Sequence, residues 1–174
     1  MIIKYSIKNY KEYKNKLLKI IDSMPNIGAE QDYIKNCGTS VSKSDWLLNR
    51  DVIKPYADLF FEMVKPFIVF VEEQYSTKSK IDSFWFQQYY KNDYHNWHTH
   101  PHTHFSNVFY LELPKGNPGT EFLAYDSKKN KELDLKEGDI LSFPAFMAHK
   151  SPEIKTNKRK TVIVFNTTLY HVKV

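Results

Sequence analysis

Four of the seven histidines of the chain lie in one short segment, NWHTHPHTHF, at residues 96–105. Side chains two positions apart in a β-strand point to the same face, so His98 and His100 can present their imidazoles to one metal ion. Neutral imidazole is a ligand for iron, zinc, copper and nickel. Pro101 disfavours regular strand pairing beyond this pair. We therefore expect His98 and His100 to be metal ligands and the next two histidines to belong to a loop.

A third ligand must come from another part of the chain, and after the cluster only His149 and His171 remain. His149 ends the segment EGDILSFPAFMAH, which reads as a turn, a short apolar strand, a proline and then the histidine. A histidine at the end of a strand in the same small sheet would complete a metal site with His98 and His100. The competing interpretation is an exposed histidine-rich turn with no metal function.

Arg159 stands out because it and Arg50 are the only arginines among 25 basic residues. It opens the predicted strand RKTVIVF and shares a strand face with Thr161. A planar guanidinium can bind a carboxylate through two hydrogen bonds, and a nearby hydroxyl suits the same ligand. These two residues predict a carboxylate-binding site. The alternative is a surface arginine in a basic turn.

The first part of the chain, residues 1–80, is predicted to be mainly helical. Apolar residues occur at helical spacing in 10–24, and residues 46–75 show a mixed helical periodicity. We expect the second segment to be interrupted at Pro55 and Pro66, because proline ends or kinks helices.

From residue 81 onward the pattern changes to short strands separated by turns rich in glycine, proline and asparagine. This predicts a β-sandwich or small barrel at 81–174, against which the helical region packs. The length of the chain is that of one domain, 1–174. The predicted strands are 84–90, 105–113, 120–125, 131–135, 140–143 and 161–165.

With 41% hydrophobic and 26% charged residues, the chain has the composition of a soluble globular protein. The net charge is +5, but the cations are mostly scattered lysines rather than the arginines that read base edges, so we expect no nucleic-acid partner. The single cysteine, Cys37, excludes an internal disulfide and fits a reducing compartment. We expect no secretory signal, and the longest apolar stretch, at 66–71, is too short for a membrane span. We expect a cytoplasmic protein without a membrane partner.

Three ordered segments together resemble a known family. They are HTHPHTHFSNVFYL at 98–111, GDILSFPAFMAH at 138–149 and RKTVIVFN at 159–166. This order resembles the bacterial and phage group of 2-oxoglutarate- and Fe(II)-dependent oxygenases, which carry an H-x-H-P and S-G-x-x-Y-L signature. The similarity covers residues 84–167, about half of the chain, and Asn107 stands where the signature has glycine.

The resemblance implies a mainly β fold with N-terminal helices, in which residues 81–174 form a double-stranded β-helix of the jelly-roll or cupin type. It also implies one Fe(II) ion. His98 and His149 match the two usual histidine ligands, and His100 stands where most members carry aspartate or glutamate.

By the same resemblance, Arg159 and Thr161 match the element that binds the distal carboxylate of the cosubstrate 2-oxoglutarate. Tyr89 falls where related enzymes place a tyrosine that contacts the cosubstrate. Such an enzyme uses O2 to decarboxylate 2-oxoglutarate and to hydroxylate a C–H bond of a small-molecule or peptidyl substrate, which leaves succinate and CO2. No catalytic side chain beyond the metal centre is implied. Further candidate site residues are His104, Ser106, Tyr110 and Asn166.

Two other functions remain open. One is a cupin-type metalloprotein, either a three-histidine dioxygenase or a small-molecule binder, that uses His98, His100 and His149 without 2-oxoglutarate. Cupins place a glutamate three or four residues after the H-x-H pair, and His104 occupies that position here as a reserve ligand. The other is a non-enzymatic, partner-binding protein whose histidines lie on the surface.

Overall fold

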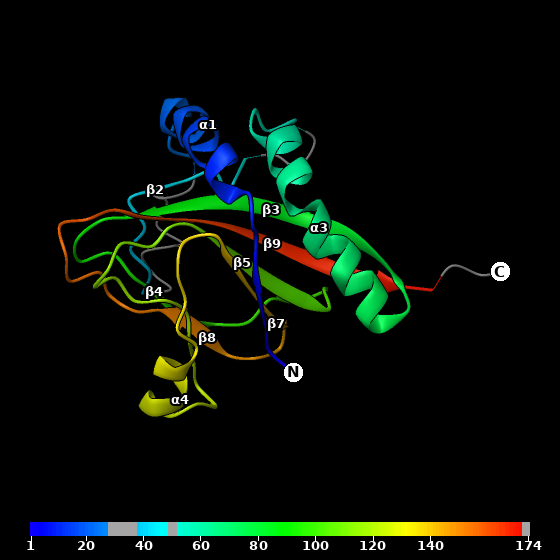
Figure 1. The fold of residues 1–174 in the computed structure, drawn as a ribbon. Helices are drawn as coiled ribbons and strands as arrows, with labels where there is room; N and C mark the ends of the chain where they lie inside the picture. Colours follow the sequence, from blue (N-terminus) through cyan, green and yellow to red (C-terminus); the bar gives the residue numbers. More distant parts are fainter. Residues whose placement is uncertain (28–37, 49–51, 172–174) are drawn as a thin grey trace.

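The computed structural model describes residues 1–27, 38–48 and 52–171 (Figure 1). None of the helices in these ranges combines the length and the apolar character that crossing a lipid bilayer requires. The helices are α1 (Tyr10–Ser23), α3 (Ala57–Tyr75) and α4 (Ser127–Glu132). The strands are β1 (Ile3–Ser6), β2 (Lys43–Ser44), β3 (Lys78–Tyr89), β4 (His95–His98), β5 (Phe105–Glu112), β6 (Glu121–Phe122), β7 (Asp139–Pro144), β8 (His149–Ser151) and β9 (Lys160–Tyr170).

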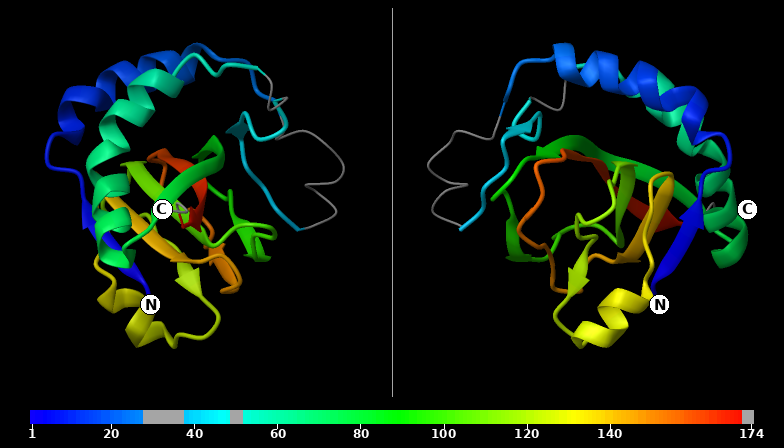
Figure 2. Two further views of the ribbon diagram at one scale, coloured as in Figure 1. Left: turned by 90° about the vertical axis from the view of Figure 1, so that its right-hand side faces the viewer. Right: turned by 60° about the vertical axis from the view of Figure 1, so that its left-hand side comes forward.

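The strands form two antiparallel sheets. The larger sheet has the order β1-β7-β5-β9-β3-β2, and the smaller has the order β4-β8-β6. Figures 1 and 2 show α1 and α3 along one side of the larger sheet, with β4 and β8 on its other side. The chain is therefore mainly β with N-terminal helices, as predicted.

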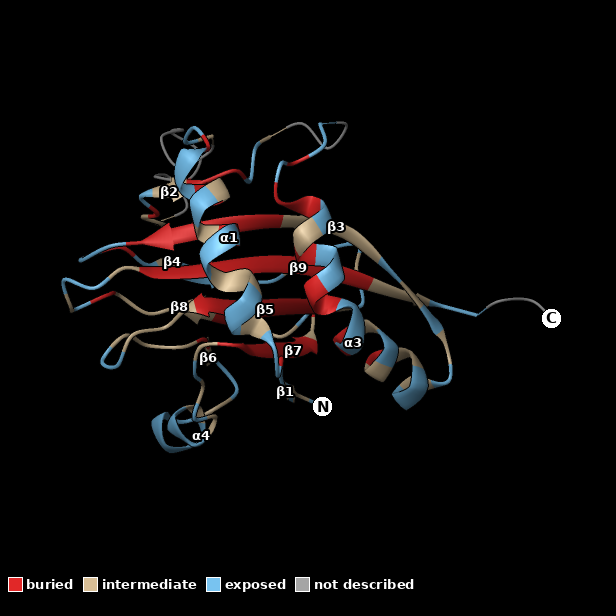
Figure 3. Ribbon diagram, turned by 45° about the horizontal axis from the view of Figure 1, so that its top comes forward, coloured by how far each residue is buried: buried red, intermediate tan, exposed pale blue. Residues whose placement is uncertain are grey.

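Alternation along the strands of the larger sheet divides the buried side chains between two cores. Figure 3 shows the buried strands lying beneath α1 and α3. The core on the helix side includes Phe60, Phe67, Phe86, Phe109, Ile163 and Phe165. The core between the two sheets includes Trp85, Tyr89, Val108, Phe122, Phe143, Val162 and Val164. Neighbours in sequence on β3 and β9 thus face different layers of the molecule.

The predicted helical region, residues 1–80, contains strands as well as helices. β1 pairs with β7, and β2 pairs with β3, so this region contributes two strands to the larger sheet. The predicted interruption at Pro66 is wrong, because α3 continues through it. Met63 and Phe67 on either side of this proline are buried in the core, and their packing outweighs the one backbone hydrogen bond that proline removes.

The predicted strand at 131–135 is also wrong, because its first two residues lie in α4 and the rest in the loop that follows. The Asp126 side chain caps this helix by accepting a hydrogen bond from the Lys129 backbone N–H at 2.8 Å. Such local bonds favour a helix start over a strand. The predicted strand at 120–125 shortens to β6, and the remaining four correspond to β3, β5, β7 and β9.

Candidate metal centre

The pairing of β4 with β8 brings distant histidines together. His98 lies opposite His149 across the two strands. His100 lies two residues beyond the end of β4, and its backbone N–H donates to the carbonyl oxygen of Ala145 at 2.9 Å. One ring nitrogen from each of the three histidines lies within 4.8 Å of the others. The structure therefore places the three predicted ligands in one group.

Backbone carbonyls orient two of these rings. Nδ1 of His98 lies 2.7 Å from the carbonyl oxygen of Asn96, and Nδ1 of His149 lies 2.9 Å from that of Met147. A carbonyl oxygen only accepts hydrogen bonds, so each Nδ1 carries the ring proton. Each Nε2 therefore keeps its lone pair for a metal ion, which is the usual arrangement around metal-binding histidines.

The side chain of Asn166 orients the imidazole ring of His100. Nδ1 of His100 lies 2.7 Å from Oδ1 of Asn166, whose amide nitrogen donates to Ser83 Oγ at 3.2 Å. The amide oxygen accepts, so His100 also carries its proton on Nδ1 and leaves Nε2 free. The further candidate residue Asn166 thus contacts a predicted ligand and fixes its orientation.

Burial keeps the three imidazoles uncharged. It lowers the pKa of His149 to about 3 and that of His100 to about 4. Burial also lowers the pKa of His98. Near neutral pH all three rings are in the neutral form that binds metals. The group contains no carboxylate, so these ligands leave the charge of a bound cation uncompensated.

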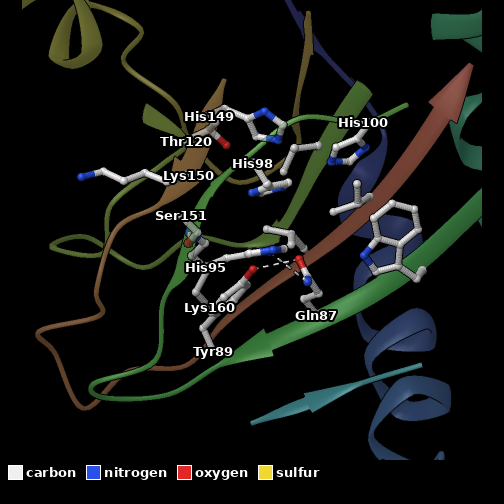
Figure 4. A pocket seen from close by; sticks show the side chains of 14 residues that line it. Gln87, Tyr89, His95, His98, His100, Thr120, His149, Lys150, Ser151 and Lys160 are labelled. Carbon is white, nitrogen blue, oxygen red and sulfur yellow. Dashed lines mark hydrogen bonds between the residues drawn. The ribbon is translucent and has the colours of Figure 1, made fainter. Parts of the chain in front are cut away.

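A buried lysine that is not among the predicted site residues lies in the same cavity. Lys160 is only 2% exposed, and its Nζ donates to Ser151 Oγ at 2.7 Å and to the Pro118 carbonyl oxygen at 3.0 Å. Figure 4 shows Lys160 and Tyr89 at one end of the cavity and the three histidines at the other. Burial lowers the pKa of the Lys160 ammonium to about 7.

Within the described part of the chain, no carboxylate forms a salt bridge with Lys160. A buried ammonium without a carboxylate partner is unfavourable by itself and is suited to an acidic ligand. The direction of the Lys160 side chain could be predicted from the sequence, because residues two apart in a strand share a face and Lys160 precedes the buried Val162 and Val164 at this spacing.

The predicted carboxylate-binding pair, Thr161 on β9 and Arg159 just before it, points away from the cavity. Arg159 donates from Nε and Nη2 to the two carboxylate oxygens of Glu112, at 2.7 and 3.1 Å, and from Nη1 to Asp22 at 2.8 Å. Thr161 Oγ1 also donates to Glu112. Neither residue lines the cavity. The carboxylates that Arg159 contacts belong to the protein itself, so the structure does not bring the predicted ligand-binding pair to the cavity. One step along a strand reverses the direction of the side chain.

Tyr89, the other residue that the resemblance linked to the cosubstrate, does line the cavity. Its hydroxyl donates to Oε1 of Gln87 at 2.8 Å, and burial raises its pKa. The Lys160 ammonium lies 5.0 Å from the centre of its ring, within range of a cation–π contact. Tyr89 therefore helps to hold the lysine side chain in place.

The other three candidates do not line the cavity. His104 is exposed, and its Nδ1 accepts the backbone N–H of Leu169 at 3.0 Å, so the structure does not bring it to the metal group as a reserve ligand. Tyr110 is buried, which raises its pKa to about 12, and its hydroxyl lies 2.7 Å from Oγ1 of the cavity residue Thr120. Ser106 is fully buried beside β7 and β9.

His95 and Gln87 also line the cavity, although the sequence analysis did not select them. His95 stands three residues before His98, and a regular strand would direct the two side chains to opposite faces. The pairing of β4 with β8 shifts register between them, so both reach the same cavity. An irregularity of this kind depends on the partner strand and cannot be read from residue types alone.

A larger cleft of about 690 Å³ opens beside this cavity. Trp85, His95, His98 and His100 line both, so the histidine group forms part of the wall of the cleft. Its volume is in the range of sites for small molecules. The apolar part of its lining includes Val41, Trp46, Leu48, Val52, Phe61 and Phe84.

No protein-family model and no curated protein sequence matches the chain. Solved structures do resemble it. A 2OG-Fe(II) oxygenase family oxidoreductase from Burkholderia pseudomallei superposes with a TM-score of 0.68 and 10% identity, over 96% of this chain and 84% of that chain. HygX from Streptomyces hygroscopicus, with nickel and 2-oxoglutarate bound, gives a TM-score of 0.65 and 7% identity, over 96% and 82%.

A third similar structure is a viral collagen prolyl hydroxylase from Paramecium Bursaria Chlorella virus-1 in complex with 2OG. It gives a TM-score of 0.59 and 13% identity, over 95% of this chain and 94% of that chain. At these identities the likeness establishes a shared fold. The site must therefore be interpreted from the residues of this chain.

Proposed function

We propose that this chain is a 2-oxoglutarate- and Fe(II)-dependent oxygenase that hydroxylates a small-molecule or peptidyl substrate. One observation carries the proposal: the buried Lys160, without a carboxylate partner among the described residues, shares a cavity with three histidines whose Nε2 atoms are free. A dicarboxylate that meets the metal at one end and Lys160 at the other fits both features. The shared fold supports this, and we take the two sheets as the halves of a double-stranded β-helix.

The three histidines fit a resident metal ion. Their nitrogen atoms converge, their rings are neutral, and each Nδ1 is held by an oxygen acceptor. In this proposal His98, His100 and His149 bind Fe(II) through Nε2. Bound there, Fe(II) would supply the activation of O2 that is coupled to oxidative decarboxylation of 2-oxoglutarate.

Lys160 takes the role that the resemblance assigned to Arg159. Its ammonium would bind the distal carboxylate of 2-oxoglutarate, and a charge-assisted bond in a buried cavity is strong. Ser151 and Tyr89 hold the lysine side chain, and Thr120 offers a further hydroxyl in the same cavity. The negative carboxylate would raise the pKa of Lys160 and keep it charged.

The cleft beside the cavity is the proposed substrate site. Its lining residues Trp85, His98 and His100 also line the cavity, so a substrate bound there would lie next to the metal. The apolar walls would exclude water from the reacting C–H bond. The indole Nε1 of Trp85 is buried without a hydrogen-bond partner among the described residues.

The proposal is tested by incubating the protein with Fe(II), 2-oxoglutarate and O2 and measuring succinate and CO2. We expect succinate formation above background that disappears when the metal, the cosubstrate or O2 is omitted. A protein that binds metal but neither binds nor consumes 2-oxoglutarate would contradict the proposal.

A second candidate function is a three-histidine metalloprotein that does not use 2-oxoglutarate. The observation in its favour is the ligand set itself, because the group consists of three imidazoles, whereas the facial triad of non-haem Fe(II) oxygenases has two histidines and a carboxylate. Metal binding without any affinity for 2-oxoglutarate would favour this candidate over the first.

A further inference from the structure

His95 lies against a predicted metal ligand. The ring centres of His95 and His98 are 3.9 Å apart and their planes differ by 9°, so the two imidazoles stack face to face. His98 lies in turn 4.2 Å from His149 and 5.2 Å from His100, measured between ring centres. Among the three predicted ligands, His95 thus stacks on His98, and it lies on the side of the cavity that contains Gln87 (Figure 4).

A hydrogen-bonded chain sets the tautomer of His95. The Tyr89 hydroxyl donates to Oε1 of Gln87 at 2.8 Å, which fixes the orientation of the amide. The amide Nε2 of Gln87 then lies 3.4 Å from Nδ1 of His95. An amide nitrogen only donates, so this Nδ1 accepts and the ring proton of His95 is on Nε2. This tautomer is the opposite of that of His98, His100 and His149.

In this tautomer His95 has no ring nitrogen free to bind a metal ion, unlike the three predicted ligands. Its Nδ1 lone pair is used by Gln87, and its Nε2 carries a proton, so neither nitrogen is free for a metal. Independently of the tautomer, His95 is not part of the group whose nitrogen atoms lie within 4.8 Å of one another. What it offers instead is a flat, fixed surface against the ring of His98.

We propose that His95 is a positioning residue of the metal centre, which holds the ring plane of His98 by stacking and is itself held by Gln87 and Tyr89. The hydrogen bond from Nδ1 of His98 to Asn96 restrains one edge of that ring, and the stack restrains rotation out of its plane. The inference rests on the three-histidine metal centre of the proposed function, but on neither 2-oxoglutarate nor turnover.

Zinc affinity of the metal-free protein tests this role, because imidazole binds zinc and no reaction follows. We expect His95→Ala to weaken zinc binding by roughly 10–100-fold, the usual effect of losing a group that orients a ligand. His95→Phe keeps a flat ring and should remain close to wild type. His102→Ala, which removes an exposed loop histidine, is the matched control. Circular dichroism and thermal melting report whether each variant is folded.

The outcomes separate the alternatives. Equal zinc affinity in wild type and His95→Ala would overturn the positioning role. A loss in His95→Phe as large as that in His98→Ala would show that His95 is itself a ligand. Failure of the wild type to bind zinc would overturn the metal centre of the proposed function, and the inference with it.

A measurement on the wild type alone tests the tautomer. Nitrogen-15 NMR distinguishes protonated from unprotonated ring nitrogens. In the zinc-loaded protein we expect His95 to carry its proton on Nε2, and the three ligands to carry theirs on Nδ1. A proton on Nδ1 of His95 would contradict the hydrogen-bonded chain through Gln87 and Tyr89.

Discussion

Lys160, the first residue of β9, and Arg159, which precedes it, are neighbours in the sequence, yet their side chains lie on opposite sides of the sheet. Nζ of Lys160 donates to Ser151 Oγ at 2.7 Å in the cavity between the sheets. Nε of Arg159 donates to Glu112 at 2.7 Å, on the face that also meets Asp22 of α1. Because successive side chains along a strand point to opposite sides, the ammonium of Lys160 faces the cavity and the guanidinium of Arg159 does not.

Removing one ligand should abolish stoichiometric metal binding. We expect His149→Ala to lose the ion, because two imidazoles hold a divalent metal much more weakly than three. His104→Ala, which changes a histidine outside the converging group, should retain one ion per chain. Elemental analysis after metal loading and gel filtration measures both. Equal metal content in the two variants would contradict the assignment.

Asn166 should affect metal affinity without touching the metal. Asn166→Ala removes the acceptor that holds Nδ1 of His100, and we expect zinc affinity to fall by roughly 10–100-fold. Ser83→Ala removes only the outer hydrogen bond to Asn166 and should have a smaller effect. Competition with a chelator measures both affinities. An unchanged affinity in Asn166→Ala would mean that this hydrogen bond does not orient the ligand.

The affinity for 2-oxoglutarate should depend on pH through Lys160. Burial lowers the pKa of its ammonium to about 7, so the charged form that attracts a carboxylate is complete only below this pH. We expect the affinity to fall as pH rises from 7 to 9, approaching a tenfold loss per pH unit. Lys160→Arg keeps its charge over this range, so any affinity it retains should be nearly independent of pH. Calorimetric titration of the zinc-loaded protein measures this, and a flat profile in the wild type would contradict it.

A buried ion pair beside the cleft should be needed for stability. The carboxylate of Asp45 is fully buried and lies 2.8 Å from Lys54 Nζ. It also accepts hydrogen bonds from the Phe86 backbone N–H at 2.8 Å and from the Tyr56 hydroxyl at 2.9 Å. Asp45→Ala leaves the lysine buried and unpaired, so we expect a loss of about 3–5 kcal/mol in the free energy of unfolding. Glu73→Ala, at an exposed helix position, should change it by less than about 0.5 kcal/mol. Denaturant titration measures both, and similar values would contradict the role of the pair.

The β core could be predicted because its pattern is local. Four of the predicted strands correspond to β3, β5, β7 and β9, whose apolar residues and flanking turns are visible in the sequence. β1 and β2 could not be predicted this way, because they are short and gain their hydrogen bonds from β7 and β3 far along the chain. Pro66 wrongly indicated a helix break because tertiary packing decides whether a helix continues.

The three histidines could be predicted in part, because the H-x-H spacing selects His98 and His100, and His149 follows a recognisable apolar strand, β7. The strand positions differ from the prediction, since His100 lies beyond the end of β4 and His149 begins β8. The basic residue that faces the cavity could not be identified from how rare its residue type is. Arginine is the rare type in this chain, but Lys160 rather than Arg159 lines the cavity. The position of Lys160 could be predicted from its spacing, because it lies two and four residues before the apolar Val162 and Val164 of β9 and so shares their face. His95 needed knowledge of the irregular pairing of β4 with β8, which depends on tertiary structure.

The most direct test of the account is a titration of the zinc-loaded protein with 2-oxoglutarate, in wild type, Lys160→Met and Arg159→Met. We expect saturable binding in the wild type and a loss of about 30-fold or more in Lys160→Met, since truncating one partner of a buried charged pair costs about 2 kcal/mol or more. Arg159→Met should bind like the wild type, once melting shows that it is folded. The account would be contradicted by no binding in the wild type, or by a loss in Arg159→Met while Lys160→Met binds normally.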